Sequence, residues 1–162
     1  MIRPGMKPER NMSNEELKSV LGDINPSLVF EEDSEWLNMF IEPAGWLPFA
    51  NQIRTAVNLS FDYLFCLTCV DWKTHLTIVY HLSSTTWRHN IVIKSKLDRN
   101  NPEIESVTGI WKTADFHERE VYELFGVKFL HHPDLRKLIL PDEWTGFPLR
   151  KDYEDPVNMI KL

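Results

Sequence analysis

The chain has 162 residues, 43% hydrophobic and 26% charged, which suits one globular domain with a sizeable core. Its formal net charge of −6, with no Lys/Arg block longer than two residues, argues against a nucleic-acid-binding protein. No apolar run approaches the roughly 18 residues of a membrane span, and the N-terminus lacks the apolar core of a signal peptide, so we expect a cytosolic protein.

The first third of the chain is expected to hold an arm, a helix and short extended segments. Residues 1–12 contain two prolines and a glycine without periodicity, which predicts a mobile N-terminal arm. Ser13 and Glu16 have the spacing of a capping box, and the apolar stripe that follows predicts a helix ending at Gly22. Extended segments are then expected at residues 28–32 and 37–42, and a helix at 47–57.

The middle of the chain carries the clearest strand pattern. Apolar and polar residues alternate over His75–Leu82, and an apolar run at 65–70 precedes this segment. A further strand with Ile91 and Ile93 on one parity predicts an antiparallel hairpin whose turn is residues 83–86. Beyond the sheet we expect a short helix at 103–109 and a longer one at 113–125, stopped by Gly126.

This order of elements predicts an α+β fold for residues 13–140. We expect two layers, with a mixed β-sheet and helices on one of its faces. Residues 141–162 hold three prolines and a glycine, which disfavour regular structure, yet they are rich in aromatic and aliphatic side chains. We therefore predict an extended C-terminal arm whose apolar side chains are covered either by the domain or by a partner.

The only two cysteines, Cys66 and Cys69, have C-x-x-C spacing. Their apolar flanks predict a strand rather than the helix N-terminus of a redox pair, and residues three apart on a strand point to opposite faces. A zinc site would need two further ligands. We therefore interpret them as two packed, reduced thiols.

The densest group of ionisable residues lies between 115 and 140, and suggests an active site, a metal site or a protein interface. On the helix from Thr113, an apolar face is expected to include Phe116, Val121, Leu124 and Phe125. The polar residues Glu118, Arg119 and Tyr122 are expected mostly away from that face, with Glu120 and Glu123 flanking it. An ion pair between Arg119 and Glu123 would fit an exposed helix surface.

The spacing of the residues in this run does not match that of known catalytic motifs. His117-Glu118 begins like a metalloprotease motif, but the fifth position is Val121 instead of histidine. Glu118 and Glu120 are two apart and do not converge on a helix. The chain has no nucleophile elbow, phosphate loop or dinucleotide-binding loop. One alternative stays open, a zinc site built from His117, His131 and His132, although adjacent histidines on an extended segment diverge.

An interface suits these residues better. Arg119 and Arg136 can each hold a carboxylate with two hydrogen bonds, and we expect them to matter most for bracing the loop or docking on a partner. Glu118, Glu120 and Asp134 can receive such contacts, from a partner or from this chain. Pro133 and Asp134 favour a fixed turn.

The same run resembles the signature of the C subunit of the proton-translocating NADH-quinone oxidoreductase, respiratory complex I. The matching residues are Glu118-Arg119-Glu120, Glu123-Leu124-Phe125, His132, Arg136 and Leu138-Ile139. The resemblance extends upstream over 66–72 and 75–82, and downstream over 141–144, Gly146 and 148–153. It covers roughly residues 27–155. The cysteine pair is not part of the family pattern, and we expect neither a fused D subunit nor a mitochondrial presequence.

The resemblance implies a structural subunit with no catalytic, cofactor-binding or metal-binding residue of its own. NADH, FMN, the iron–sulfur clusters and quinone would belong to partner subunits. The chain would hold the quinone-binding D subunit near the B and I subunits, at the cytoplasmic face of the bacterial inner membrane. The implied interface residues are Glu118, Arg119, Glu120, Glu123, His132, Pro133, Asp134, Arg136, Trp144, Pro148, Arg150 and Tyr153. A membrane-bound hydrogenase or another donor-linked complex is the alternative setting, and a stand-alone metal or thiol protein is the second alternative.

Overall fold

Five strands form one mixed sheet in the computed structural model, which describes residues 11–32 and 34–155. Most of the predicted N-terminal arm and the last seven residues of the predicted C-terminal arm lie outside this range. The elements, in chain order, are α1 (Asn14–Ile24), β1 (Val29–Glu31), β2 (Leu37–Phe40), α2 (Pro43–Thr55), β3 (Tyr63–Asp71), β4 (His75–Ser83), β5 (Asn90–Asp98), β6 (Glu103–Glu105), α3 (Ala114–Phe125) and β7 (Lys128–Leu130).

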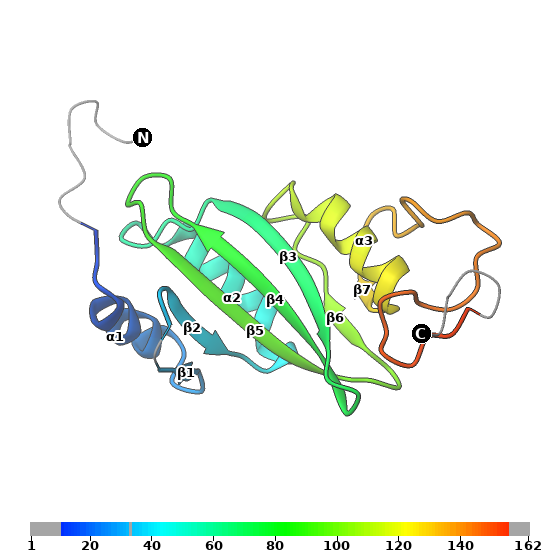
Figure 1. Ribbon diagram of the computed structural model, residues 1–162. Coiled ribbons are helices and arrows are strands. Elements are labelled where there is room, and N and C mark those ends of the chain that lie inside the picture. The colour runs from blue at the N-terminus through cyan, green and yellow to red at the C-terminus, as the bar shows by residue number, and fades with distance from the viewer. Residues whose placement is uncertain (1–10, 33, 156–162) are drawn as a thin grey trace.

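The sheet has the strand order β1-β2-β5-β4-β3. The β2–β5 pairing is parallel and the other three are antiparallel, so the predicted mixed sheet is confirmed. The predicted hairpin is β4–β5, although its turn is longer than expected and closes between Ser84 and His89. A separate parallel pair, β6–β7, lies beside α3 (Figure 1).

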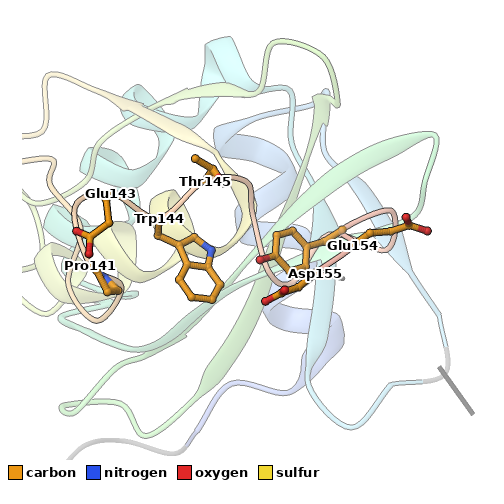
Figure 2. Close-up of a pocket in the computed structure, with 7 residues that line it drawn as sticks. Pro141, Glu143, Trp144, Thr145, Glu154 and Asp155 are labelled. Carbon is orange, nitrogen blue, oxygen red and sulfur yellow. The ribbon is translucent and has the colours of Figure 1, made fainter. Parts of the chain in front are cut away.

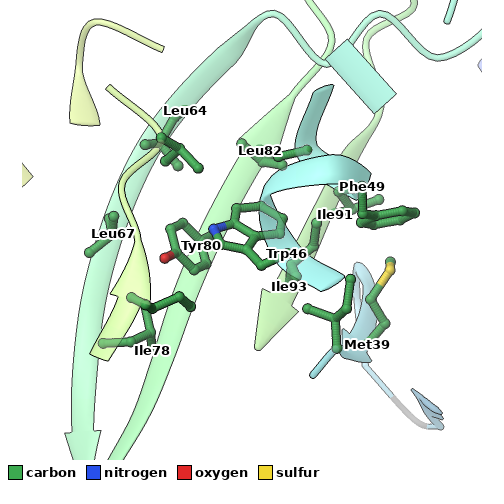
Figure 3. Close-up of a cluster of buried hydrophobic side chains, with 14 of the residues drawn as sticks. Met39, Trp46, Phe49, Leu64, Leu67, Ile78, Tyr80, Leu82, Ile91 and Ile93 are labelled. Atoms are coloured by element: carbon green, nitrogen blue, oxygen red, sulfur yellow. The ribbon is translucent and has the colours of Figure 1, made fainter. Parts of the chain in front are cut away.

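The core lies on one face of the sheet. Alternate residues of β4, among them Ile78 and Tyr80, are fully buried and share one cluster with side chains from all three helices. The indole of Trp46 on α2 lies on the Tyr80 ring, with centroids 4.4 Å apart, as Figure 3 shows. This arrangement is the predicted α+β layering, with helices on one face.

Two helix boundaries differ from the prediction. The Ser13 capping box is present, but α1 continues past Gly22 to Ile24. The predicted helix at 47–57 begins earlier, at Pro43, because a proline is well suited to the first position of a helix, where its missing N–H has no partner to lose. The additional turn brings Trp46 into the core.

The predicted short helix at 103–109 is wrong. Residues Glu103–Glu105 form β6, which pairs in parallel with β7, and a turn follows in which Ile110 N–H donates to the Val107 carbonyl. The pairing partner lies 25 residues further along the chain, at Lys128–Leu130. Such long-range pairing overrides a short local pattern.

Candidate protein interface

The predicted helix at 113–125 is confirmed as α3, which ends at Gly126 with the left-handed φ of +74°. Its faces differ from the prediction. Phe116 is 61% exposed, whereas Glu118, Arg119 and Glu123 are buried. One side of α3 faces the core, Glu118 holds the segment after β6, and Arg119 and Glu123 hold the loop after β7.

Glu118 is completely buried and binds the segment after β6. Its carboxylate accepts the Ser106 hydroxyl at 2.6 Å and the Val107 N–H at 2.8 Å. Burial raises the pKa of Glu118 to about 7, while these two hydrogen bonds oppose the rise. Glu118 therefore braces the domain internally.

The two adjacent histidines diverge, as predicted. The His131 side chain is 83% exposed and lies 2.8 Å from Glu105. The His132 side chain is fully buried, and its Nδ1 accepts the Asp134 N–H at 3.0 Å. Its Nε2 therefore carries the proton and donates to the Asp115 carbonyl at 3.3 Å. Within residues 11–32 and 34–155, no group of three or more histidine, cysteine or carboxylate side chains is placed to hold a metal.

Glu123 anchors the loop after His132. Its carboxylate accepts the backbone N–H groups of Leu138, Ile139 and Leu140 at distances of 2.9–3.0 Å. Three consecutive amides pointing at one anion form a nest, which fixes the backbone conformation of that segment. The exposed pairing of Glu123 with Arg119 is therefore replaced by a buried contact to the backbone.

Two cationic side chains, Arg119 and Lys137, bind backbone carbonyl groups of the same loop. Arg119 donates from Nε to the Arg136 carbonyl at 3.2 Å and from Nη2 to the Lys137 carbonyl at 3.4 Å. The Lys137 ammonium in turn donates to the carbonyls of Pro141, Asp142 and Trp144 at 2.7–3.1 Å. Arg119 thus holds carbonyl groups instead of the carboxylate we expected.

The arm from residue 141 onward lies against its own domain. The Leu149 N–H donates to the Leu124 carbonyl, and the Arg150 guanidinium donates to the Phe125 carbonyl at 2.7 Å. The ring of Phe147 covers Gly126 so closely that a Cβ at residue 126 would lie 2.5 Å from it. We expected either the domain or a partner to cover the apolar side chains of the arm, and the domain covers part of them.

A buried carboxylate joins the arm to the sheet. Asp71, at the end of β3, is 3% exposed and accepts two hydrogen bonds from Arg99 together with the N–H groups of Lys73 and Lys151. These partners hold the pKa of Asp71 well below its usual range, the Arg99 guanidinium most strongly. Arg99 also binds Asp152 of the arm at 2.7 Å.

Five exposed apolar side chains lie along α3 and the segments fixed to it. They are Phe116, Leu138, Ile139, Phe147 and Leu149, exposed by 61, 37, 67, 37 and 52%. We call them the arm surface. The carboxylate of Glu123 holds the backbone that carries Leu138 and Ile139, and exposed apolar side chains of this kind are candidates for a protein interface.

The other predicted site residues lie around this surface. Glu120, Trp144, Pro148, Arg150 and Tyr153 are half-buried, and Pro133 is exposed. Asp134 and Arg136 form an exposed ion pair at 2.8 Å. Sequence reasoning missed Lys137, Asp71 and Arg99. Asp71 left a signal, because it follows Leu67 and Cys69 at the two-residue period of the buried face of β3.

The cysteines lie on β3, as predicted, and both are free thiols. Cys69 is buried and Cys66 is half-buried, next to an irregularity in the β3–β4 register. Burial raises the pKa of both thiols, that of Cys69 to about 12. Raised values oppose the thiolate that redox chemistry requires.

No helix in the described part of the chain has the length and apolar character needed to cross a membrane. Solved structures that share the fold include the following two. A trypsin-resistant fragment of Nqo5 matches 74% of this chain and 98% of its own length, with a TM-score of 0.63 and 24% identity. The second is a chain of the membrane-bound sulfane sulfur reductase, an archaeal respiratory complex; it matches 86% of this chain and 85% of its own length, with a TM-score of 0.75 and 22% identity.

Relatives found by sequence comparison have a higher identity to this chain than these two structures have. The C/D subunit of NADH-quinone oxidoreductase from Phocaeicola vulgatus is 48% identical over 62% of this chain, which spans 20% of that relative. The C subunit from Chloroherpeton thalassium is 42% identical over 67% of the chain, and 46% of that relative is covered. The C subunit from Roseiflexus is 37% identical over 85% of the chain and 80% of its own length.

The family model that matches residues 39–157 describes the 30 kDa subunit of the respiratory-chain NADH dehydrogenase. The match runs from the second half of β2 to the end of the described arm, and so includes α3, the loop fixed by Glu123 and the segment bound to Asp71. The chain belongs to the family of the 30 kDa subunit of the respiratory-chain NADH dehydrogenase, which includes the C subunit of NADH-quinone oxidoreductase.

Proposed function

We propose that this chain is a structural subunit of a proton-translocating NADH-quinone oxidoreductase, and that its arm surface holds the quinone-binding D subunit. The observation that carries the proposal is the placement of exposed apolar side chains on a backbone fixed by Glu123, Arg119 and Lys137. In this proposal the charged signature does no chemistry on a substrate. These residues set the shape of the surface on which the neighbouring subunit docks.

The relatives support the D subunit as the partner. In the Phocaeicola vulgatus and Bacteroides relatives, the name C/D indicates that the two subunits share one polypeptide. Two subunits that are joined in one polypeptide meet each other at a high effective concentration, which favours a stable contact between them. We further propose that the B and I subunits are neighbours of this chain in the same complex.

The chemistry of the complex is proposed to lie in other subunits. NADH, FMN, the iron–sulfur clusters and quinone would bind there, and this chain would have no active site. The assembly would sit at the cytoplasmic face of the bacterial inner membrane, where this subunit is attached through its partners. A different donor-linked complex remains the second candidate, because the sulfane sulfur reductase chain has the same fold.

Deletion of residues 141–162 tests the docking role. The chain is co-expressed with the D subunit of the same organism, and the amount of this partner that co-purifies is measured. We expect the deletion to abolish recovery of the partner while circular dichroism still shows the helices and sheet. Unchanged recovery with the truncated chain would refute the docking role of the arm.

A further inference from the structure

In the described part of the chain, no helix covers one of the two faces of the five-stranded sheet. The helices pack on the core face, and Figure 1 shows the other face of β3, β4 and β5 open towards the viewer. The solvated face of such a sheet is normally polar. Here it carries large apolar side chains, and Val70 and Trp72, at and just after the end of β3, are 37 and 56% exposed. This face is a second candidate interface, apart from the arm surface.

A groove of about 300 Å³ opens on this face, and we call it the sheet groove. Thr77 and Val79 of β4 line it and are both buried, so they lie at its bottom. The aromatic rings of Phe40 and Trp72 line it as well. The sheet groove shares no described lining residue with the pocket of the C-terminal arm, which Figure 2 shows around Trp144. It is therefore a separate apolar surface with aromatic rings at its sides.

Lysine side chains lie along one side of the sheet groove. Lys94 and Lys96 line it, and their ammonium groups lie 5.6 and 4.9 Å from the centroid of the Phe40 ring. Lys94 forms an ion pair with Glu31 at 2.6 Å. Lys96 is exposed and forms no ion pair with another described residue. The groove therefore carries a net positive charge, on a chain whose formal net charge is −6.

The C-terminal arm adds a third lysine beside the sheet groove. The Lys151 ammonium lies 5.9 Å from the centroid of the Trp72 ring, and the Lys151 N–H donates to Asp71 at 2.9 Å. Within residues 11–32 and 34–155, this ammonium has no carboxylate partner. The Trp72 ring also stacks on His75, with planes inclined by 19°. The groove is therefore continuous with the arm, and Lys151 adds to the positive charge at that end.

The charge of the sheet groove indicates what binds there. A symmetric contact between two copies of the chain would bring the same lysines together, because such a contact joins identical patches. A basic patch instead complements an acidic partner. We propose that the sheet groove binds an acidic segment of a neighbouring subunit, in which an apolar side chain packs against Phe40 and Trp72 and a carboxylate pairs with Lys96. The inference rests on the proposed place of this chain in a multisubunit complex, and it adds a contact separate from the arm surface.

Carbodiimide cross-linking of the native complex tests the chemistry of the partner segment. The reagent joins a lysine amine to a carboxylate with loss of water, and it adds no spacer, so the two groups must already be in contact. The complex is cross-linked and digested, and peptides joined to Lys96 are identified by mass spectrometry. We expect Lys96 to be joined to an aspartate or glutamate of another subunit. The absence of such a link, or links only to carboxylates of this chain, would overturn the proposal.

Charge variants separate this inference from the docking role of the arm. Lys96→Glu reverses the charge, Lys96→Arg keeps it, and Lys112→Glu, at an exposed lysine before α3, is the matched control. Each variant replaces the wild-type chain in the complex, and the recovery of every subunit is measured by quantitative mass spectrometry. We expect Lys96→Glu to lower recovery of the subunit linked to Lys96 about fivefold, and the other two variants to retain it. Full recovery of every subunit with Lys96→Glu, combined with loss of the D subunit on deletion of residues 141–162, would reject the sheet groove while leaving the docking role intact.

Discussion

At the scale of single residues, the main feature is the use of buried charges to shape a backbone. Glu118, Arg119 and Glu123 are each buried, and each directs its polar atoms to groups of its own chain. Removing the partners of a buried charge destabilises a fold by about 3–5 kcal/mol, so each of these residues needs its hydrogen-bond partners to be kept. All three side chains brace the backbone of their own chain.

Replacing Glu123 by glutamine should loosen the loop. Glutamine retains one acceptor oxygen, whereas the carboxylate accepts three amides from residues 138–140. We expect a loss of about 1–3 kcal/mol in the free energy of unfolding, measured with urea. Glu120→Gln, at a half-buried neighbour on α3, is the control and should change it little. Faster hydrogen exchange at residues 138–140 should accompany the loss, and unchanged exchange there would contradict this account.

Glu118 should make stability depend on pH. Its pKa rises from 4.5 in the unfolded chain to about 7 in the fold, so the folded state binds the extra proton between these values. The unfolding free energy should therefore fall as pH rises from 4.5 to 7. In Glu118→Gln, which keeps an acceptor for Val107, this part of the slope should disappear in urea titrations at several pH values. An identical slope in both proteins would show that Glu118 is not its source.

At the scale of elements, the C-terminal arm is fixed to α3 and to the end of β3. Gly126 is central, because its left-handed conformation ends α3 and its missing side chain makes room for Phe147. Further along, Lys151 and Asp152 reach the Asp71–Arg99 pair. The arm surface thus depends on contacts at two separate elements.

A Gly126→Ala substitution should release the arm. The left-handed backbone costs a non-glycine residue about 1–2 kcal/mol, and the added Cβ would meet the Phe147 ring at 2.5 Å. We expect faster tryptic cleavage after Arg150 and Lys151, followed by mass spectrometry. Gly109→Ala, where nothing lies within 4 Å of an added Cβ, should be cleaved at the wild-type rate. Equal cleavage in both variants would show that Phe147 does not anchor the arm.

The sequence predicted those elements whose signals are local. The alternation over β4 and the Gly126 stop of α3 are properties of a few neighbouring residues, and both predictions are confirmed. The strand β6 was mistaken for a helix because β7, which pairs with it, is distant in sequence. The burial of Glu123 was missed for a similar reason, since its partners are backbone amides 15–17 residues away. No side-chain pattern reports where such amides will lie.

At the scale of the whole molecule, the helices cover one face of the sheet, and the loop and arm extend from the α3 end (Figure 1). The arm surface belongs to this end. The domain core is complete without a partner, whereas apolar side chains remain exposed on the arm. This distribution suits a protein that folds by itself and then binds a neighbour.

The most direct test of the docking role is the recovery of the D subunit with a chain altered only on the arm surface. Ile139→Asp and Leu149→Asp together place two charges on side chains that are 67 and 52% exposed, so the fold should tolerate them. Val57→Asp, at a residue that is 85% exposed outside this surface, is the control. We predict that the double variant loses this partner during purification and that the control retains it. Equal recovery of the partner with both proteins would contradict the account.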